Sequence, residues 1–181
     1  VKLRWYELMF YFSNFTTITA GPILRANSMK SIYGISEGAT VQIQTQTRRY
    51  IIRPALAISL ILLGIIKKWW LAGIFAANWV NPVFENPMQY SSLNVLGAIY
   101  GYTIQLFFDF SGYTDLVIGI AMLLGFKLPQ NFCMPLKAFN IRDFWDRWHI
   151  SLSTWIRDYI YIPLGGSKKG FIRTQINLLL A

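Results

Sequence analysis

The sequence has few of the residues that build disulfides, metal sites and charged surfaces. Its 181 residues contain one cysteine and one histidine, and only 14% are Asp, Glu, Lys or Arg. Because Cys133 is alone, it has no partner in this chain for a disulfide or a cysteine-based zinc site, and a small apolar filler is its plainer role. A soluble domain has about a quarter charged residues. With 54% hydrophobic residues, the composition therefore predicts a membrane protein.

Charge is also missing from four long runs, at 8–24, 54–66, 69–84 and 86–108. A helix needs about 20 mostly apolar residues to cross a bilayer, so only the last run is clearly long enough by itself. Prolines and Lys67–Lys68 interrupt the shorter runs, which predicts tilted, kinked or re-entrant helices. Irregular backbone of this kind survives at membrane depth only where protein or a wet cavity covers it.

Turn-forming residues suggest where the helices begin and end. We expect a first span near 5–19, a loop at 81–87, and helices at 92–110 and 113–126 joined by a hinge at Ser111–Gly112. The chain opens on Val1 and stops soon after another apolar segment starts, too short to cross a bilayer. We therefore expect residues 1–181 to be part of a single multi-pass membrane domain that is truncated at both ends.

The net charge of +9 comes from basic clusters that flank the apolar runs. Clusters in these places bind anionic lipid headgroups, and no nucleic-acid-binding module accompanies them. The expected fold class is all-α: a polytopic membrane protein with short, kinked and re-entrant helices, plus an amphipathic helix at an interface or cavity.

That amphipathic helix is expected at 141–159, with Asn140 as its N-cap and Asp143 in its first turn. Six charged residues lie between Arg142 and Asp158, and each would cost at least about 2.5–3.5 kcal/mol at the centre of a bilayer. The helix is thus expected to lie at the membrane interface or to line a water-filled cavity. A continuous helix would gather five polar side chains into one stripe: Arg142, Asp146, His149, Ser153 and Arg157.

His149 has the only side chain here whose ordinary pKa lies near neutrality, so it can accept and return a proton. Helical spacing would let Asp146 orient the imidazole and bring Ser153 within its reach. A catalytic or substrate-positioning histidine and a merely structural one remain about equally supported. A Ser153 nucleophile is disfavoured, since a residue inside a helix lacks the exposed turn and oxyanion donors that this catalysis needs.

Three other charged residues have two interpretations each. Asp109 and Asp115 lie between apolar runs, where an ionisable group is a functional hypothesis, but they could equally belong to the start of a helix near Tyr113. Arg25 is expected to anchor the chain at the membrane surface rather than to contact substrate.

Three segments stand out: FTTITAGPILR at 15–25, QLFFDFSGYTDLVIGIAMLLGFKLPQNF at 105–132 and IRDFWDRWHISLSTWIRDYIYIPLGG at 141–166. They resemble successive signatures of the membrane-bound O-acyltransferase family, in the branch of the alginate and peptidoglycan O-acetyltransferases. The D-alanyl transferase of teichoic acids has a similar FWxRWHxSLS region but typically lacks the PLGG found here at 163–166.

The resemblance implies a multi-pass enzyme of the bacterial cytoplasmic membrane that passes an acyl group through a tunnel. The donor would be a cytoplasmic acyl thioester such as acetyl-CoA, with no bound cofactor or metal. The acceptors would be hydroxyls of an extracytoplasmic polysaccharide, with separate acetyltransferase proteins as possible partners. The family's principal catalytic histidine lies downstream of PLGG and so beyond Ala181, and this piece alone is expected to be inactive.

His149 matches the family's second histidine. It would line the tunnel as an accessory catalytic residue, with Asp146 holding its tautomer. Substrate contacts are expected from Asp146, Ser153, Arg142 and Arg157, although ion pairing such as Asp143 with Arg147 is the plainer use of these charges. A transporter or channel subunit, and an inactive scaffold member of the family, are the alternative interpretations.

Overall fold

The computed structural model describes residues 4–27, 29–31, 34–45 and 49–181. It is mostly helical, as the sequence predicts, and departs from an all-α chain by one short antiparallel pair, β1 (Met29–Ser31) and β2 (Gly34–Ser36). Two compact units divide the chain. The hairpin unit contains Ile18–Gly21 and Arg48–Lys127, and the terminal unit contains Val1–Thr17, Pro22–Thr47 and Leu128–Ala181.

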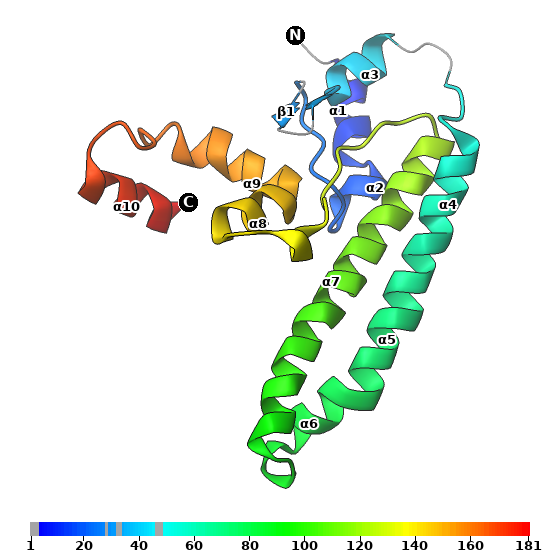
Figure 1. Ribbon diagram of the computed structural model, residues 1–181. Coiled ribbons are helices and arrows are strands. Elements are labelled where there is room, and N and C mark those ends of the chain that lie inside the picture. The colour runs from blue at the N-terminus through cyan, green and yellow to red at the C-terminus, as the bar shows by residue number, and fades with distance from the viewer. Residues whose placement is uncertain (1–3, 28, 32–33, 46–48) are drawn as a thin grey trace. The chain divides into compact units, whose positions relative to one another are not determined.

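Two long helical stretches lie side by side in the hairpin unit (Figure 1). The first runs from Pro54 to Glu85 and the second is α7 (Ser92–Leu123). Each has 32 residues and is long and apolar enough to cross a membrane. The first comprises α4 (Pro54–Ile65), η1 (Ile66–Leu71), α5 (Ala72–Phe75), η2 (Ala76–Val80) and α6 (Asn81–Glu85).

The structure corrects three boundaries expected here. Lys67–Lys68 do not interrupt the first stretch, because η1 and η2 continue it as π-helical turns. The loop expected at 81–87 is helical as far as Glu85, and the short 3₁₀ turn η3 (Pro87–Gln89) follows it. No hinge exists at Ser111–Gly112, since α7 passes through both residues. It begins at Ser92, and the Oγ of the N-cap residue Ser91 accepts a hydrogen bond from the amide of Asn94.

Small residues allow the two stretches to approach closely. Gly64 in α4 and Gly112 in α7 face each other, and a Cβ atom at either position would meet the backbone of the other within 3 Å. Gly119 approaches the backbone of Ala57 in the same way, which fixes an antiparallel pairing. Packing through small residues is typical of helices that associate inside a membrane.

Ion pairs join the same two stretches. The Nζ of Lys67 lies 2.6 Å from a carboxylate oxygen of Asp115, and the Nζ of Lys68 lies 2.6 Å from one of Asp109. The alternative that Asp109 and Asp115 begin a helix near Tyr113 is therefore wrong, because both lie inside α7. Charges on apolar helices are costly when alone, so each carboxylate is used to neutralise a lysine of the other stretch.

The terminal unit contains shorter elements. The span expected at 5–19 is divided into α1 (Trp5–Phe12) and α2 (Phe15–Ile18), and neither has the length to cross a membrane. After β1 and β2 comes α3 (Ala39–Thr45). The C-terminal part holds η4 (Pro135–Lys137), α8 (Ile141–Arg147), α9 (Ile150–Ile156), η5 (Arg157–Tyr161) and α10 (Phe171–Leu180).

The close approach at Gly112 gives a stability prediction. A Cβ there would lie 2.8 Å from both the oxygen of Gly64 and the amide nitrogen of Lys68, so the helices would have to separate. Gly112→Ala is expected to lower the free energy of unfolding by about 1–3 kcal/mol. In the matched control Gly73→Ala, nothing lies within 4 Å of the new Cβ, and helix propensity would stabilise by up to about 1 kcal/mol. Denaturation in detergent followed by circular dichroism measures both, and equal effects would contradict this packing.

Candidate active site

The helix expected at 141–159 is broken at the histidine. α8 ends at Arg147, Trp148 is extended with φ −104° and ψ 127°, and α9 begins at Ile150. Between them His149 has φ 44° and ψ 53°, in the left-handed region. The prediction of one continuous helix is therefore wrong. A left-handed residue other than glycine costs about 1–2 kcal/mol, so the surrounding structure must hold it in place.

The loop segment 131–133 pairs with residues on both sides of this break. Phe132 pairs with Trp148 as an antiparallel β-bridge, and their rings meet edge to face at 5.0 Å between centroids. The amide of Cys133 donates to the carbonyl of Arg147 at 3.0 Å, and the amide of Ile150 donates to the carbonyl of Asn131 at 3.0 Å. Backbone groups released where the helix stops are thus paired with the loop.

Side chains extend this arrangement to a third segment. The Oγ of Ser151 donates to the Oδ1 of Asn131 at 2.6 Å, and the amide of Ile23 donates to the same Ser151 Oγ at 2.9 Å. Asn131 is 1% exposed and Ser151 is fully buried. Segments 15–25, 105–132 and 141–166 therefore contribute one residue each to a buried hydrogen-bond network beside His149.

The imidazole of His149 is half-buried. Burial lowers the pKa of His149 below its ordinary value, because the charged form loses hydration. The neutral form therefore prevails at pH 7. A neutral imidazole has both a donor and an acceptor nitrogen, so it can take a proton from a hydroxyl or orient one by hydrogen bonding.

The break separates the residues expected to share a stripe with His149. Arg142 and Asp146 are exposed on α8, whereas Ser153 and Arg157 follow the break. Ser153 donates its Oγ to the carbonyl of Trp148 at 3.2 Å and its amide to the carbonyl of His149 at 3.0 Å. Its hydroxyl therefore caps the break, and a role for Asp146 in holding the imidazole tautomer stays a prediction.

Two expectations about α8 are confirmed. The Oδ1 of Asn140 accepts the amide of Asp143 at 2.9 Å, as an N-cap does. Arg147 donates its Nε to Asp143 at 2.6 Å, which is the i,i+4 pair expected from the sequence. That hydrogen bond is the largest cause of the lowered pKa of Asp143.

Residues 5–181 match the model of the membrane-bound O-acyltransferase family. The chain belongs to this family. It is 38% identical over 175 residues to the probable alginate O-acetylase AlgI of Pseudomonas fluorescens, covering 92% of this chain and 31% of that protein. The peptidoglycan O-acetyltransferase of Helicobacter pylori is 35% identical, covering 94% and 31%. The teichoic acid D-alanyltransferase of Bacillus subtilis is 45% identical over 80 residues, covering 43% and 20%. The chain thus spans about a third of the length of the first two relatives.

The PLGG segment at 163–166, which is part of the stretch that resembles the family, forms a turn. Gly165 and Gly166 have φ of 110° and 54°, values that favour glycine. Asn177 of α10 is buried and donates its Nδ2 to the carbonyl of Gly166 at 2.9 Å. This contact, which ties the PLGG turn to α10, could not be predicted from the sequence pattern.

A second missed contact joins the AGPILR segment to η5. Arg25 is buried, and its Nη1 lies 2.7 Å from Asp158, while its guanidinium lies 5.2 Å from the ring centroid of Tyr159. The expectation of a membrane-surface anchor is therefore corrected. Arg157 also donates to Asp158, at 2.6 and 3.1 Å. The Asp158 carboxylate therefore pairs with two guanidinium groups, those of Arg25 and Arg157. This pairing raises the pKa of Arg157, to which the charge of Asp146 adds a smaller contribution.

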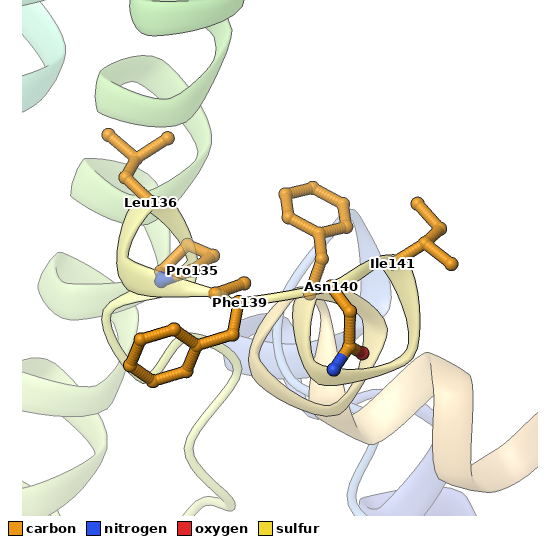
Figure 2. A pocket seen from close by; sticks show the side chains of 7 residues that line it. Pro135, Leu136, Phe139, Asn140 and Ile141 are labelled. Atoms are coloured by element: carbon orange, nitrogen blue, oxygen red, sulfur yellow. The ribbon is translucent and has the colours of Figure 1, made fainter.

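An open groove lies at the start of α8 and holds none of the five candidate residues. Figure 2 shows the side chains around it, which are mainly apolar. They are Pro135, Leu136, Ala138, Phe139, Asn140, Ile141 and Phe144. Such a lining suits contact with hydrocarbon better than with a charged donor.

Among the described residues, no group of His, Cys, Asp or Glu side chains could hold a metal ion.

The Arg25–Asp158 pair predicts that Asp158→Asn lowers the stability of the protein more than Arg157→Gln does. Asp158→Asn would leave the buried Arg25 guanidinium without its carboxylate, and we expect a loss of about 3 kcal/mol in the free energy of unfolding. Arg157→Gln is the matched control, since Arg157 is 48% exposed at its side chain and Asp158 keeps Arg25. It is expected to cost less than about 1 kcal/mol. Unfolding in detergent measures both, and a larger loss for Arg157→Gln would contradict this assignment.

Proposed function

We propose that the protein is a membrane-bound O-acyltransferase that moves an acetyl group from a thioester donor to hydroxyls of an extracytoplasmic polysaccharide. The observation that carries the proposal is the match of 5–181 to the family, with relatives named for acylation of alginate, peptidoglycan and teichoic acid. The left-handed His149 at the break between α8 and α9 supplies a chemical group suited to it.

We place the protein in the bacterial cytoplasmic membrane as a multi-pass domain. The two 32-residue helical stretches of the hairpin unit support this placement, because their length and composition suit a bilayer. Exposed apolar side chains along them, such as Leu62, Trp69 and Leu96, would face lipid. Short, kinked and re-entrant helices within this domain remain part of the proposal.

The chemical step is direct acyl transfer. A base takes the proton of the acceptor hydroxyl, the oxygen attacks the thioester carbonyl, the C–O bond forms and the C–S bond breaks, and the thiolate leaves and is protonated. The principal base is proposed to be another histidine of the whole gene product, as the family resemblance implies. His149 would line the path of transfer, and its neutral imidazole would orient the hydroxyl or share its proton.

The donor is proposed to be an acyl thioester such as acetyl-CoA, which is consumed as a substrate. Arg142 is exposed on α8 and is the freer candidate for donor phosphates, while Arg157 is engaged with Asp158. Asp146 and Ser153 would act through hydrogen bonds near the break. Lipids surround the domain, and separate extracytoplasmic acetyltransferase proteins are proposed to complete transfer to the polymer.

The intramembrane acids that suggest a transporter have another use in this structure. Asp109 and Asp115 neutralise Lys68 and Lys67 between the two stretches, so they do not require an ion pathway to explain them. This favours the enzyme over the transporter or channel subunit.

Transfer of label tests the proposal. Membranes containing the whole gene product are given acetyl-CoA labelled in the acetyl group, and label in cell-surface polymer is measured. His149→Asn removes the acid–base group but keeps a residue tolerant of the left-handed conformation, and we expect transfer to fall about 10²-fold or more. Met88→Ala changes a side chain that is 98% exposed between the long helices and should transfer normally.

Two results would count against the proposal. Full transfer by His149→Asn would remove His149 from the chemistry. An absence of label with every acyl thioester tried, in wild-type protein that is folded and inserted, would exclude the acyltransferase and favour the scaffold or transporter.

A further inference from the structure

We infer that Asn131 and Ser151 are positioning residues that hold His149 in its left-handed conformation and thereby set its place in the active site. The contacts around the break support this positioning role. The consequence of the role for acyl transfer rests on the function proposed above.

The helix α9 lacks a side-chain cap of its own. The first amides of a helix have no partner within the helix and are usually satisfied by the side chain of the N-cap residue. His149 occupies that position in α9, and its side chain makes no capping hydrogen bond. The amides of Ile150 and Ser151 therefore need acceptors from elsewhere.

Asn131 supplies both acceptors from a distant part of the sequence. Its carbonyl oxygen accepts the amide of Ile150 at 3.0 Å, and its Oδ1 accepts the amide of Ser151 at 3.3 Å. The same Oδ1 accepts the Ser151 hydroxyl at 2.6 Å. Asn131 thus does what an N-cap residue normally does, in place of the side chain of His149.

The cap that Asn131 provides cannot easily be replaced. Asn131 and Ser151 are both buried, so water has no access to the amides if the Asn131 oxygens are withdrawn. Ser151 is further fixed because its Oγ accepts the amide of Ile23. A left-handed histidine is intrinsically unfavourable and persists only where its neighbours determine it. Loss of the cap should therefore let the backbone at 148–150 relax and carry the imidazole toward solvent.

The Oδ1 of Asn131, and not its Nδ2, makes the side-chain contacts of the cap. The Nδ2 of Asn131 is buried and has no hydrogen-bond partner among the described residues, whereas Oδ1 has two donors. The acceptor oxygen, and not the amide group as a whole, is what the site uses. Asn131→Asp keeps that oxygen, while Asn131→Leu keeps the volume and removes it.

The test measures the accessibility of His149 independently of activity. Membranes containing the whole gene product are treated with diethylpyrocarbonate, and peptide mass spectrometry follows modification of His149. We expect Asn131→Leu to raise the modification rate at least about threefold and Asn131→Asp to stay within about twofold of wild type. Asn177→Leu is the matched control, a buried asparagine of the same unit that bonds the PLGG turn, and it should leave the rate at His149 unchanged.

A modification rate that is unchanged in Asn131→Leu, or raised equally in Asn131→Asp or Asn177→Leu, would overturn the inference. If Asn131→Leu does not reach the membrane, Ser151→Ala replaces it, with the same expected rise.

Acetyl transfer by the same membranes tests the consequence for the proposed function. Transfer at least about tenfold lower in Asn131→Leu and restored in Asn131→Asp supports it, and full transfer despite faster modification overturns it. If wild type transfers nothing, the proposed function fails while the modification rates still decide the positioning role.

Discussion

The candidate site depends on one constraint, that backbone amides and carbonyls exposed by a broken helix must find partners. The break between α8 and α9 frees such groups at Arg147, Ile150 and Ser151, and the segment 131–133 pairs with them. Because of this pairing the chain can keep a left-handed residue at His149 while the backbone groups freed at Arg147, Ile150 and Ser151 stay hydrogen-bonded. The same hydrogen bonds bring together parts of the sequence that are far apart, so the local geometry of the histidine depends on the fold of the whole terminal unit.

A parallel constraint governs the charges. Lysines and aspartates on the two apolar stretches of the hairpin unit pair with each other, and Arg25 of the terminal unit is neutralised by Asp158. Breaking such pairs leaves a charge in a poorly hydrated place, so they specify which helices associate and in what register more than they add net stability. Charged residues in a chain with little charge are therefore mainly informative about architecture, and His149 is the exception that is suited to proton transfer.

Much of the architecture could be predicted from the sequence. The uncharged run at 86–108 indicates the long helix α7, and Asn140 with Asp143 indicates where α8 begins. The break at His149 could not be predicted, because apolar residues keep helical spacing through Trp148 and Leu152, and the acceptors that replace the helical hydrogen bonds lie in the loop near Asn131. The expected hinge at Ser111–Gly112 failed for the opposite reason, since the glycine serves close helix packing. Both the break and the missing hinge result from contacts between segments that are far apart in the sequence. The partners of Arg25 and Lys67 also lie far away in the sequence, so a local pattern could not predict them.

The most direct test is an experimental structure of the whole gene product in a lipid environment, determined by cryo-electron microscopy at a resolution that defines side chains. It should show His149 with positive φ between two short helices, with the Asn131 oxygens within hydrogen-bonding distance of the amides of Ile150 and Ser151. A helix that continues through 147–151, with Asn131 elsewhere, would contradict the account of how this site is built.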